Sequence, residues 1–214
     1  MPLATSAWEV RCVPSHSDPV TRCGRALCGH TGASAVPAKR LPADLGALWT
    51  KVLETPSAEN SFGGGGATFA CWQIGHTVAP FAPTGVESCT VKPGTKIFVA
   101  AHSVECSTFE GNGTTEAALR ACACQMDVQV APTVTLDGKP VPAAEVETRL
   151  LNIVLPADNL FGLPAGTQGL SVGHGWVALL HPLTPGTHTI VIESGTSTIT
   201  TTIVVEPGHR VRRG

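Results

Sequence analysis

Residues 175–194 read GWVALLHPLTPGTHTIVIES and form two apolar stretches on either side of a Pro-Leu-Thr-Pro-Gly turn. Each stretch has the length of a strand and contains β-branched residues, which favour extended backbone. The residues between them favour a turn, because proline fixes its own φ angle and glycine tolerates unusual ones. The pattern therefore predicts two β-strands joined as a C-terminal hairpin.

Further strands are expected on both sides of this stretch. KIFVAAHSV (96–104) is a short apolar run, typical of a strand buried on both faces. Apolar strands are also expected in TRLLNIVLP (148–156), closed by Pro156, and in STITTTIVVEP (197–207). PTVTLDGKPV (132–141) alternates apolar residues with threonine around Asp137-Gly138, which is a strong hairpin signal.

Two short helices are expected among the strands. From Leu45 to Leu53 the apolar residues fall on one helical face, and Asp44 is placed to cap the N-terminus. A second helix is expected over 114–122, where alanine and leucine favour helix and Thr114 or Thr115 is the cap.

The number and spacing of these elements predict the fold class. We expect a mainly β protein: an immunoglobulin-like or related antiparallel β-sandwich with one or two short helices and disulfides. Gly and Pro number 23 and 17, so the chain has too many breakers for a helical bundle. The sandwich domain is expected over 44–208, after an irregular segment at 1–43 and before a basic tail at 209–214.

The distribution of charge excludes one class of partner. The formal net charge of the chain is −2. Residues 1–40 carry +3 and the last six residues carry another +3, so residues 41–208 carry −8. An acidic body repels nucleic acid, and no basic strip interleaved with aromatic residues occurs, so we expect no nucleic-acid partner. No apolar run is long enough to span a bilayer, so we expect no membrane insertion.

Eight cysteines are many for 214 residues. In an exported protein they indicate disulfides. We predict the pairs Cys71–Cys89 and Cys106–Cys122, with Cys124 as the competitor for the second bond. Closing a loop of roughly 15 residues contributes about 3 kcal/mol in the chain-entropy model.

A metal site is the alternative use of the cysteines. The N-terminal segment contains Cys12, His16, Cys23, Cys28 and His30, four of which could surround a tetrahedral zinc ion. Their spacing matches no common zinc finger, and few apolar residues surround them. We therefore favour disulfides and predict no metal at the cysteines.

The stretch HSVECSTFEGNGTTE (102–116) contains the acidic residues from which a site could be built. His102, Glu105 and Glu110 are the candidate catalytic residues, because a carboxyl pair can work as acid and base in glycoside hydrolysis. No cofactor is expected, apart from a divalent cation that Glu110, Asn112 and Glu116 could bind. The alternative is structural: Glu105 ends a strand and Glu110 lies in a solvated loop.

Three further residues are candidate ligand-binding residues: Asn112, His174 and Trp176. A nucleophile signature is missing, since the chain has no Gly-x-Ser-x-Gly motif. A Ser–His pair from distant strands, built on Ser103 or Ser171, remains an alternative. Ser103 cannot pair with His102, because neighbours along a strand point to opposite faces.

Several motifs resemble a known group of proteins. CTVKPGTK, VECS, LDG and GWVALLHPLTPGTHTI occur here in an order that is similar to that in a group of uncharacterised secreted bacterial β-rich proteins. The likeness covers about residues 48–207. It implies export and oxidised cysteines, and it implies no known reaction.

The N-terminus shows no leader of its own. MPLATSAWEVRCVPSHSDPVTRC (1–23) lacks the apolar run of a secretory signal. Either the protein stays inside the cell, or its leader lies upstream of Met1. We favour the second and expect the protein to be secreted or part of the cell envelope. The predicted function is a non-catalytic domain that binds a small molecule, a cation or an extracellular polymer. The alternative is a secreted hydrolase of ester, lactone or glycoside bonds.

Overall fold

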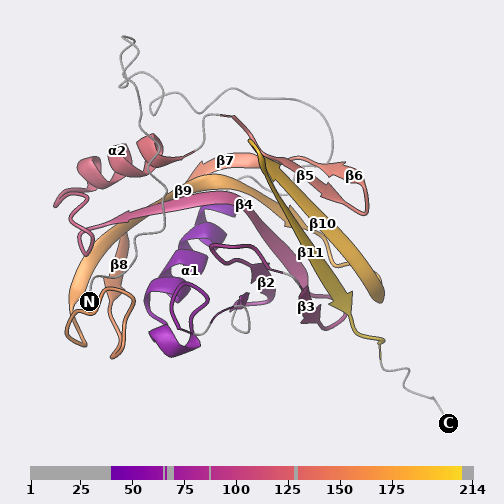
Figure 1. Ribbon diagram of the computed structural model, residues 1–214, viewed down its shortest axis with the longest axis horizontal. Coiled ribbons are helices and arrows are strands. Elements are labelled where there is room, and N and C mark those ends of the chain that lie inside the picture. Colours follow the sequence, from indigo (N-terminus) through magenta and orange to yellow (C-terminus); the bar gives the residue numbers. More distant parts are fainter. Residues whose placement is uncertain (1–39, 65, 67–69, 87, 128–129, 209–214) are drawn as a thin grey trace. The chain divides into compact units, whose positions relative to one another are not determined.

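Two β-sheets packed together and two short α-helices make up the fold (Figure 1). The computed structural model describes residues 40–64, 66, 70–86, 88–127 and 130–208, all within one compact unit, Thr31–Gly214. Cys12, His16, Cys23, Cys28 and His30, the candidate zinc ligands, lie outside the described residues.

The first sheet has the order β1-β2-β4-β9-β7, and β8 also pairs with β9. Its strands are β1 (Cys71–Ile74), β2 (Thr77–Pro80), β4 (Lys96–Ser107), β7 (Ala144–Glu147), β8 (Leu151–Val154) and β9 (Gln168–Leu180). The second sheet has the order β3-β11-β10-β5-β6. Its strands are β3 (Ser88–Val91), β5 (Thr133–Leu136), β6 (Lys139–Val141), β10 (Gly186–Ser194) and β11 (Ser197–Val205).

The predicted β-sandwich is confirmed, and its sheets are mixed rather than purely antiparallel. The pairs β2–β4 and β3–β11 are parallel, and the other pairs in the described residues are antiparallel. The predicted hairpin at 132–141 is confirmed as β5 and β6. Asp137 and Gly138 have φ angles of 50° and 74°, as a tight turn of the type I′ kind requires.

The hairpin predicted for 175–194 is wrong. Its two strands exist, but β9 belongs to the first sheet and β10 to the second, where β10 pairs with β11 and β5. The Pro-containing turn carries the chain across the sandwich, since proline lacks the N–H that would continue a ladder. Ala178 and Leu180 of β9 therefore share the core between the sheets with Ile190 and Ile192 of β10.

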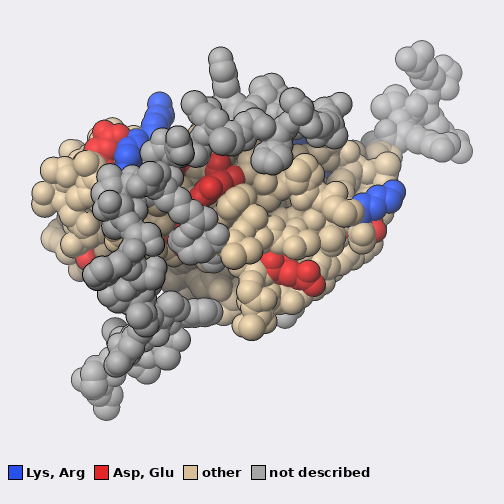
Figure 2. Space-filling view, turned by 90° about the horizontal axis from the view of Figure 1, so that it is seen from above, with Lys and Arg blue, Asp and Glu red and all other residues tan. Residues whose placement is uncertain are grey.

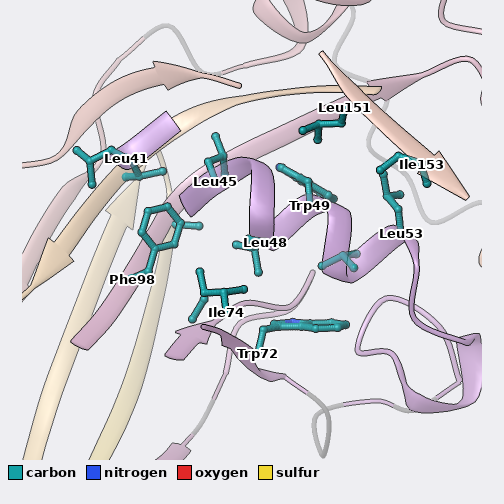
Figure 3. Packing of buried hydrophobic residues seen from close by; sticks show 14 of the residues in the cluster. Leu41, Leu45, Leu48, Trp49, Leu53, Trp72, Ile74, Phe98, Leu151 and Ile153 are labelled. Carbon is teal, nitrogen blue, oxygen red and sulfur yellow. The ribbon is translucent and has the colours of Figure 1, made fainter. Parts of the chain in front are cut away.

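Helix α1 (Leu41–Leu53) covers the outer face of the first sheet. It begins four residues earlier than the predicted Leu45, and the N-cap position belongs to Arg40 instead of Asp44. A proline near its first position explains the early start, because proline is tolerated in the first turn of a helix. Figure 3 shows its apolar face, with Leu45, Leu48 and Trp49, packed on side chains of the strands.

Helix α2 (Glu116–Met126) lies on the opposite side of β4 and β9 from α1 (Figure 1). Its cap is Thr115, one of the two predicted residues, whose hydroxyl accepts a hydrogen bond from the Ala118 N–H at 3.3 Å. The helix extends to Met126, four residues beyond the expected end. A short 3-10 helix, η2 (Ser57–Glu59), follows α1.

Both predicted disulfides are present. Cys71–Cys89 joins β1 to β3, and therefore joins one sheet to the other. Cys106–Cys122 joins β4 to α2, so Cys122 and not Cys124 is the partner of Cys106. The two bonds thus hold the sheets together at one place and fasten α2 at another.

A β-bulge in β4 decides which side chains lie on each face. Ala100 pairs with Val177 and His102 pairs with Trp176, so Ala101 is an extra residue. Before the bulge, Phe98 and Ala100 face α1. After it, odd-numbered residues face α1, since the Trp49 indole donates to Ser103, and even-numbered residues such as Cys106 face α2.

The face of the first sheet that lies opposite α1 is covered in two parts. The second sheet packs on one end, through a core that contains Ile97, Val99 and Ala101. Helix α2 packs on the other end, through a small cluster of Cys106, Leu119, Ala123 and Val172. His102 comes directly after Ala101, the last residue of β4 in the core with the second sheet. A polar region therefore lies between the second sheet and α2 on this face.

Candidate functional site

The region between the two covers contains a cluster of histidine and acidic side chains. Trp176 of β9 pairs with His102 on one neighbouring strand and with Glu145 on the other. His174 lies two residues from Trp176 on the same face of β9, because side chains alternate along a strand. Asp127 completes the group, and we call His102, Asp127, Glu145 and His174 the His–Asp cluster.

Asp127 connects the two histidines. It occupies the C-cap position of α2, and its backbone N–H donates to the Ala123 carbonyl oxygen, so the helix end positions its carboxylate. The Asp127 Oδ2 atom lies 2.6 Å from His174 Nδ1, and Oδ1 lies 3.5 Å from His102 Nε2. The Asp127 side chain is only 2% exposed. A buried carboxylate beside two imidazoles is held by charge and hydrogen bonding together.

The two histidines respond differently to this carboxylate. For His174, burial acts to lower the pKa, but the hydrogen bond to Asp127 and the charges of Asp127, Glu145 and Glu147 outweigh it and raise the pKa. For His102, burial dominates over the attraction of Asp127 and lowers the pKa. His102 is therefore the more readily neutral imidazole, with a lone pair that can accept a proton or a cation.

The cluster has the chemistry of a metal site. Asp127, Glu145 and His174 each offer a ligand atom, and these atoms all lie within 4.8 Å of one another. His174 Nε2 is 3.9 Å from Glu145 Oε1. One imidazole and two carboxylates are ligands that Zn²⁺ takes at about 2.0–2.2 Å, so modest side-chain rotations would close the site around such an ion.

Two polar atoms at the cluster lack an ordinary hydrogen bond. His102 Nε2 is buried, and its contact with Asp127 is longer than a normal hydrogen bond. The Trp176 Nε1–H is also buried and has no acceptor. In folded proteins a buried polar group nearly always has a hydrogen-bond partner, which can be an ordered water or an ion.

The candidate catalytic residues do not come together as a group of three. Glu105 and Glu110 lie close enough for a hydrogen bond between their carboxyl groups. Glu105 lies on the side of β4 that faces α1, and Glu110 reaches it from the loop after β4, whereas His102 faces α2 and contacts Asp127. The structure therefore joins the two acids and leaves the imidazole on the opposite face of the sheet.

The environment of the acid pair favours protonation. Burial raises the pKa of Glu105 to about 8, opposed by a hydrogen bond from the Ser171 hydroxyl and reinforced by the charge of Glu110. Burial likewise raises the pKa of Glu110. Near neutral pH the two carboxyl groups therefore hold a proton between them, which removes most of the repulsion of two adjacent charges.

Asn112 closes the loop that follows β4. Its Oδ1 atom accepts a hydrogen bond from the Ser107 N–H at 2.9 Å, and its own N–H donates to the Ser107 carbonyl oxygen at 3.2 Å. Glu116, another oxygen ligand expected for a cation in this loop, forms an ion pair with Arg120. These groups are thus occupied with contacts inside the loop and helix.

The serines proposed for a Ser–His pair make other contacts. The Ser103 hydroxyl donates to the His174 backbone carbonyl oxygen at 2.8 Å, and the Ser171 hydroxyl donates to the Glu105 carboxylate. His188 forms hydrogen bonds with Asp137 and with the Thr184 carbonyl oxygen. Each of these hydroxyl or imidazole groups is therefore engaged in holding strands or turns together.

Two members of the His–Asp cluster, His102 and His174, are among the residues predicted from the sequence, as is the neighbouring Trp176. Asp127 and Glu145 are not. The pairing of Asp127 with His174 spans 47 residues, so no local motif reports it. The alternation in AEVE (144–147), with two acids on one face of a strand, was the available signal for Glu145.

Two further observations bear on the kind of partner. In the described residues, no helix is both long and apolar enough to cross a bilayer. Among the described residues visible in Figure 2, charged side chains are few and scattered, in keeping with 14% charged residues in the chain. Asp127 differs from these exposed groups, because its side chain is buried.

Comparisons with known proteins add little. The sequence matches no protein-family profile and no curated protein. Among solved structures, the solution structure of amebosin is 10% identical over 61% of this chain and 96% of its own, with a TM-score of 0.25. Domains 4 and 5 of the S-layer protein SbsC are 13% identical over 56% of this chain and 48% of their own, with a TM-score of 0.19. At these values the likenesses support no statement about function.

Proposed function

We propose that this protein is an exported, non-catalytic domain that binds a divalent d-block cation, such as Zn²⁺, in the His–Asp cluster. The observation that carries the proposal is the convergence of Asp127, Glu145 and His174, whose ligand atoms lie within 4.8 Å of one another. They come from the end of α2, from β7 and from β9, which are separate elements of the chain.

The types of ligand favour this class of metal. A mixed set of imidazole and carboxylate suits Zn²⁺ and its d-block neighbours, whereas Ca²⁺ takes six to eight oxygen ligands. His102 supports the set, because its Nε2 lies 3.5 Å from the second Asp127 oxygen and can orient that carboxylate. Such outer contacts hold metal ligands in place in many proteins.

Export is supported by the sulfur chemistry. Cys71–Cys89 and Cys106–Cys122 are bonds that persist in oxidising compartments and are rare in the cytosol. The resemblance to a group of secreted bacterial proteins agrees with that compartment. A cell-envelope or secreted location is therefore part of the proposal.

Binding is better supported than the hydrolase alternative. A hydrolase built on Glu105 and Glu110 would draw on His102, which faces the other side of the sheet. Ser171 donates to Glu105, and the two acids contact each other, so their polar atoms already have partners. His102 Nε2, in the His–Asp cluster, and Trp176 Nε1, beside it, are buried and have no hydrogen-bond partner.

Zinc titration of the disulfide-intact protein tests the proposal. After removal of metal, a chromophoric chelator competes for Zn²⁺, and we expect one ion bound per chain with micromolar or tighter affinity. Asp127→Asn and His174→Gln should each weaken binding by about tenfold to a hundredfold or more. Stoichiometric binding that neither substitution affects would overturn the proposal.

The chain offers a matched control. His188 forms a pair with Asp137 in the second sheet, with a separation of 2.8 Å between Nδ1 and Oδ2. His188→Gln removes one imidazole from one His–Asp pair, as His174→Gln does, but at a distance from the cluster in the fold. We expect it to leave zinc affinity unchanged. Circular dichroism of each variant tests whether it is folded.

A further inference from the structure

The indole of Trp176 differs from those of the other tryptophans in the described residues. The Trp49 Nε1–H donates to Ser103 Oγ at 2.9 Å, and the Trp72 Nε1–H donates to the Phe81 carbonyl oxygen at 2.7 Å. The Trp176 Nε1–H is buried and has no acceptor. A buried donor without an acceptor destabilises the fold unless something supplies the acceptor.

The strand register places Trp176 beside the residues of the proposed cation site. On its two sides it pairs with His102 and Glu145, and directly opposite residues in a sheet have Cβ atoms about 4.5–5.5 Å apart. His174 is the next residue on the same face of β9. Trp176 is therefore surrounded on the sheet by three members of the His–Asp cluster.

A cation held by Asp127, Glu145 and His174 has room for another ligand. Zinc sites with three protein ligands keep a fourth position for water or an exogenous group, unlike closed structural sites with four. The charges balance as well: the two ligand carboxylates neutralise a divalent ion. Glu147, the other acid on this face, is paired with Arg120 and adds no free negative charge.

We propose that the cation at this site binds the oxyanion of a small ligand, a carboxylate or a phosphate group, and that Trp176 donates its N–H to that group. One ligand oxygen would occupy the open position on the metal, and another would accept the hydrogen bond from Trp176 Nε1. This inference rests on the proposed function, because without the cation the cluster is too acidic to attract an anion.

Anion titrations of the zinc-loaded protein test this inference. Acetate and inorganic phosphate are titrated separately into the Zn²⁺-loaded and the metal-free protein and followed by calorimetry. We expect at least one of them to bind the loaded protein and neither to bind the metal-free one. The two probes distinguish a carboxylate from a phosphate preference.

Trp176→Phe provides the second arm. It keeps the ring and removes the donor, so anion affinity should fall by about tenfold to a hundredfold, as for a hydrogen bond to a charged group, while zinc affinity stays the same. Trp72→Phe is the matched control, since it removes an indole donor away from the cluster. In the wild-type protein, Co²⁺ in place of Zn²⁺ gives a visible spectrum that the added anion should change.

The outcomes separate the two proposals. Failure of the wild-type protein to take up zinc would sink both. Zinc uptake with no response to either anion, in calorimetry and in the cobalt spectrum, would overturn only the inference about the oxyanion. Anion binding that Trp176→Phe leaves unchanged would overturn the role of Trp176. If that variant does not fold, the cobalt spectrum decides on the anion.

Discussion

Gly173 lies directly against the indole ring of Trp49: a Cβ atom added at Gly173 would come within 2.5 Å of Trp49 Cδ1. Because Gly173 has no side chain, α1 can pack this closely on β9. The same indole donates to Ser103, whose hydroxyl donates to the His174 carbonyl oxygen. The position of α1 is thus linked through two hydrogen bonds to a residue of the His–Asp cluster.

Gly173→Ala should therefore destabilise the protein. The added methyl group must displace the Trp49 ring, and overpacking of this kind typically costs about 1–3 kcal/mol. Urea unfolding followed by tryptophan fluorescence measures the change. Gly208→Ala is the control, because a Cβ there meets nothing within 4 Å. Equal stability of the two variants would show that α1 adjusts without strain.

Glu105 should make stability depend on pH between about 4.5 and 8. The pKa of this carboxyl group is about 8 in the folded protein, against 4.5 as its ordinary value, chiefly because of burial. Over this window the unfolded chain releases the proton and the folded protein keeps it, so the free energy of unfolding falls as pH rises. Above about pH 8 the contribution is constant.

Glu105→Gln should remove the part of this pH dependence that comes from Glu105 and leave the smaller part that comes from Glu110. Glutamine cannot ionise, and its side-chain oxygen can still accept the hydrogen bond from Ser171. At pH 8 we expect the variant to be more stable than the wild-type protein by about 1–3 kcal/mol, a range reduced to allow for partial solvent screening. Unfolding at pH 5 and pH 8 measures it, with the exposed Glu193→Gln as control. A wild-type protein equally stable at both pH values would contradict the prediction.

The disulfides Cys71–Cys89 and Cys106–Cys122 should differ in their effect on metal binding. Each closes a loop of similar length, so replacing either pair by alanine should cost about 3 kcal/mol of stability. Cys106–Cys122 also fastens α2 to β4, and Asp127 directly follows α2. Only the double variant Cys106→Ala/Cys122→Ala should therefore lose zinc affinity as well. Comparison with Cys71→Ala/Cys89→Ala in the same titration tests this, and equal affinities would refute it.

Thr115 and Thr114 provide a test of the α2 cap. The Thr115 hydroxyl accepts from the Ala118 N–H, so Thr115→Ala should cost about 1 kcal/mol. Thr114→Ala removes the hydroxyl of the preceding residue, which does not cap the helix, and should have little effect. Thermal unfolding of the two variants measures the difference. A larger loss in Thr114→Ala would mean that the helix begins one residue sooner.

Local features of the fold could be predicted from the sequence, because they depend on neighbouring residues. The Asp137-Gly138 turn and, to within one residue, the Thr115 cap follow from backbone preferences within a few positions. The disulfide pairs followed from loop length. The pairing partners of each strand depend instead on the packing of the whole core. For this reason the local pattern of residues 175–194 predicts a hairpin, although the segment crosses from one sheet to the other.

The candidate site was predictable only in part, for the same reason. His102, His174 and Trp176 are predicted as site residues because they are isolated polar or aromatic residues in apolar strands. Their meeting with Asp127 depends on α2 packing over β4 and β9, which places the helix end beside them. The separation of His102 from Glu105 depends on strand alternation after the bulge, and the bulge itself has no clear signal in KIFVAAHSV.

The extra residue in β4 also limits how this strand can change in length. Deleting Ala101 would restore a regular ladder and leave every later side chain on its present face. Deleting Ser103 would instead shift all residues beyond it to the opposite face, so that Glu105 would point towards α2 and Cys106 away from Cys122. Evolution can therefore shorten this strand at Ala101 without exchanging the chemistry of its two sides, whereas a one-residue loss beyond His102 would dismantle the second disulfide and the acid pair together.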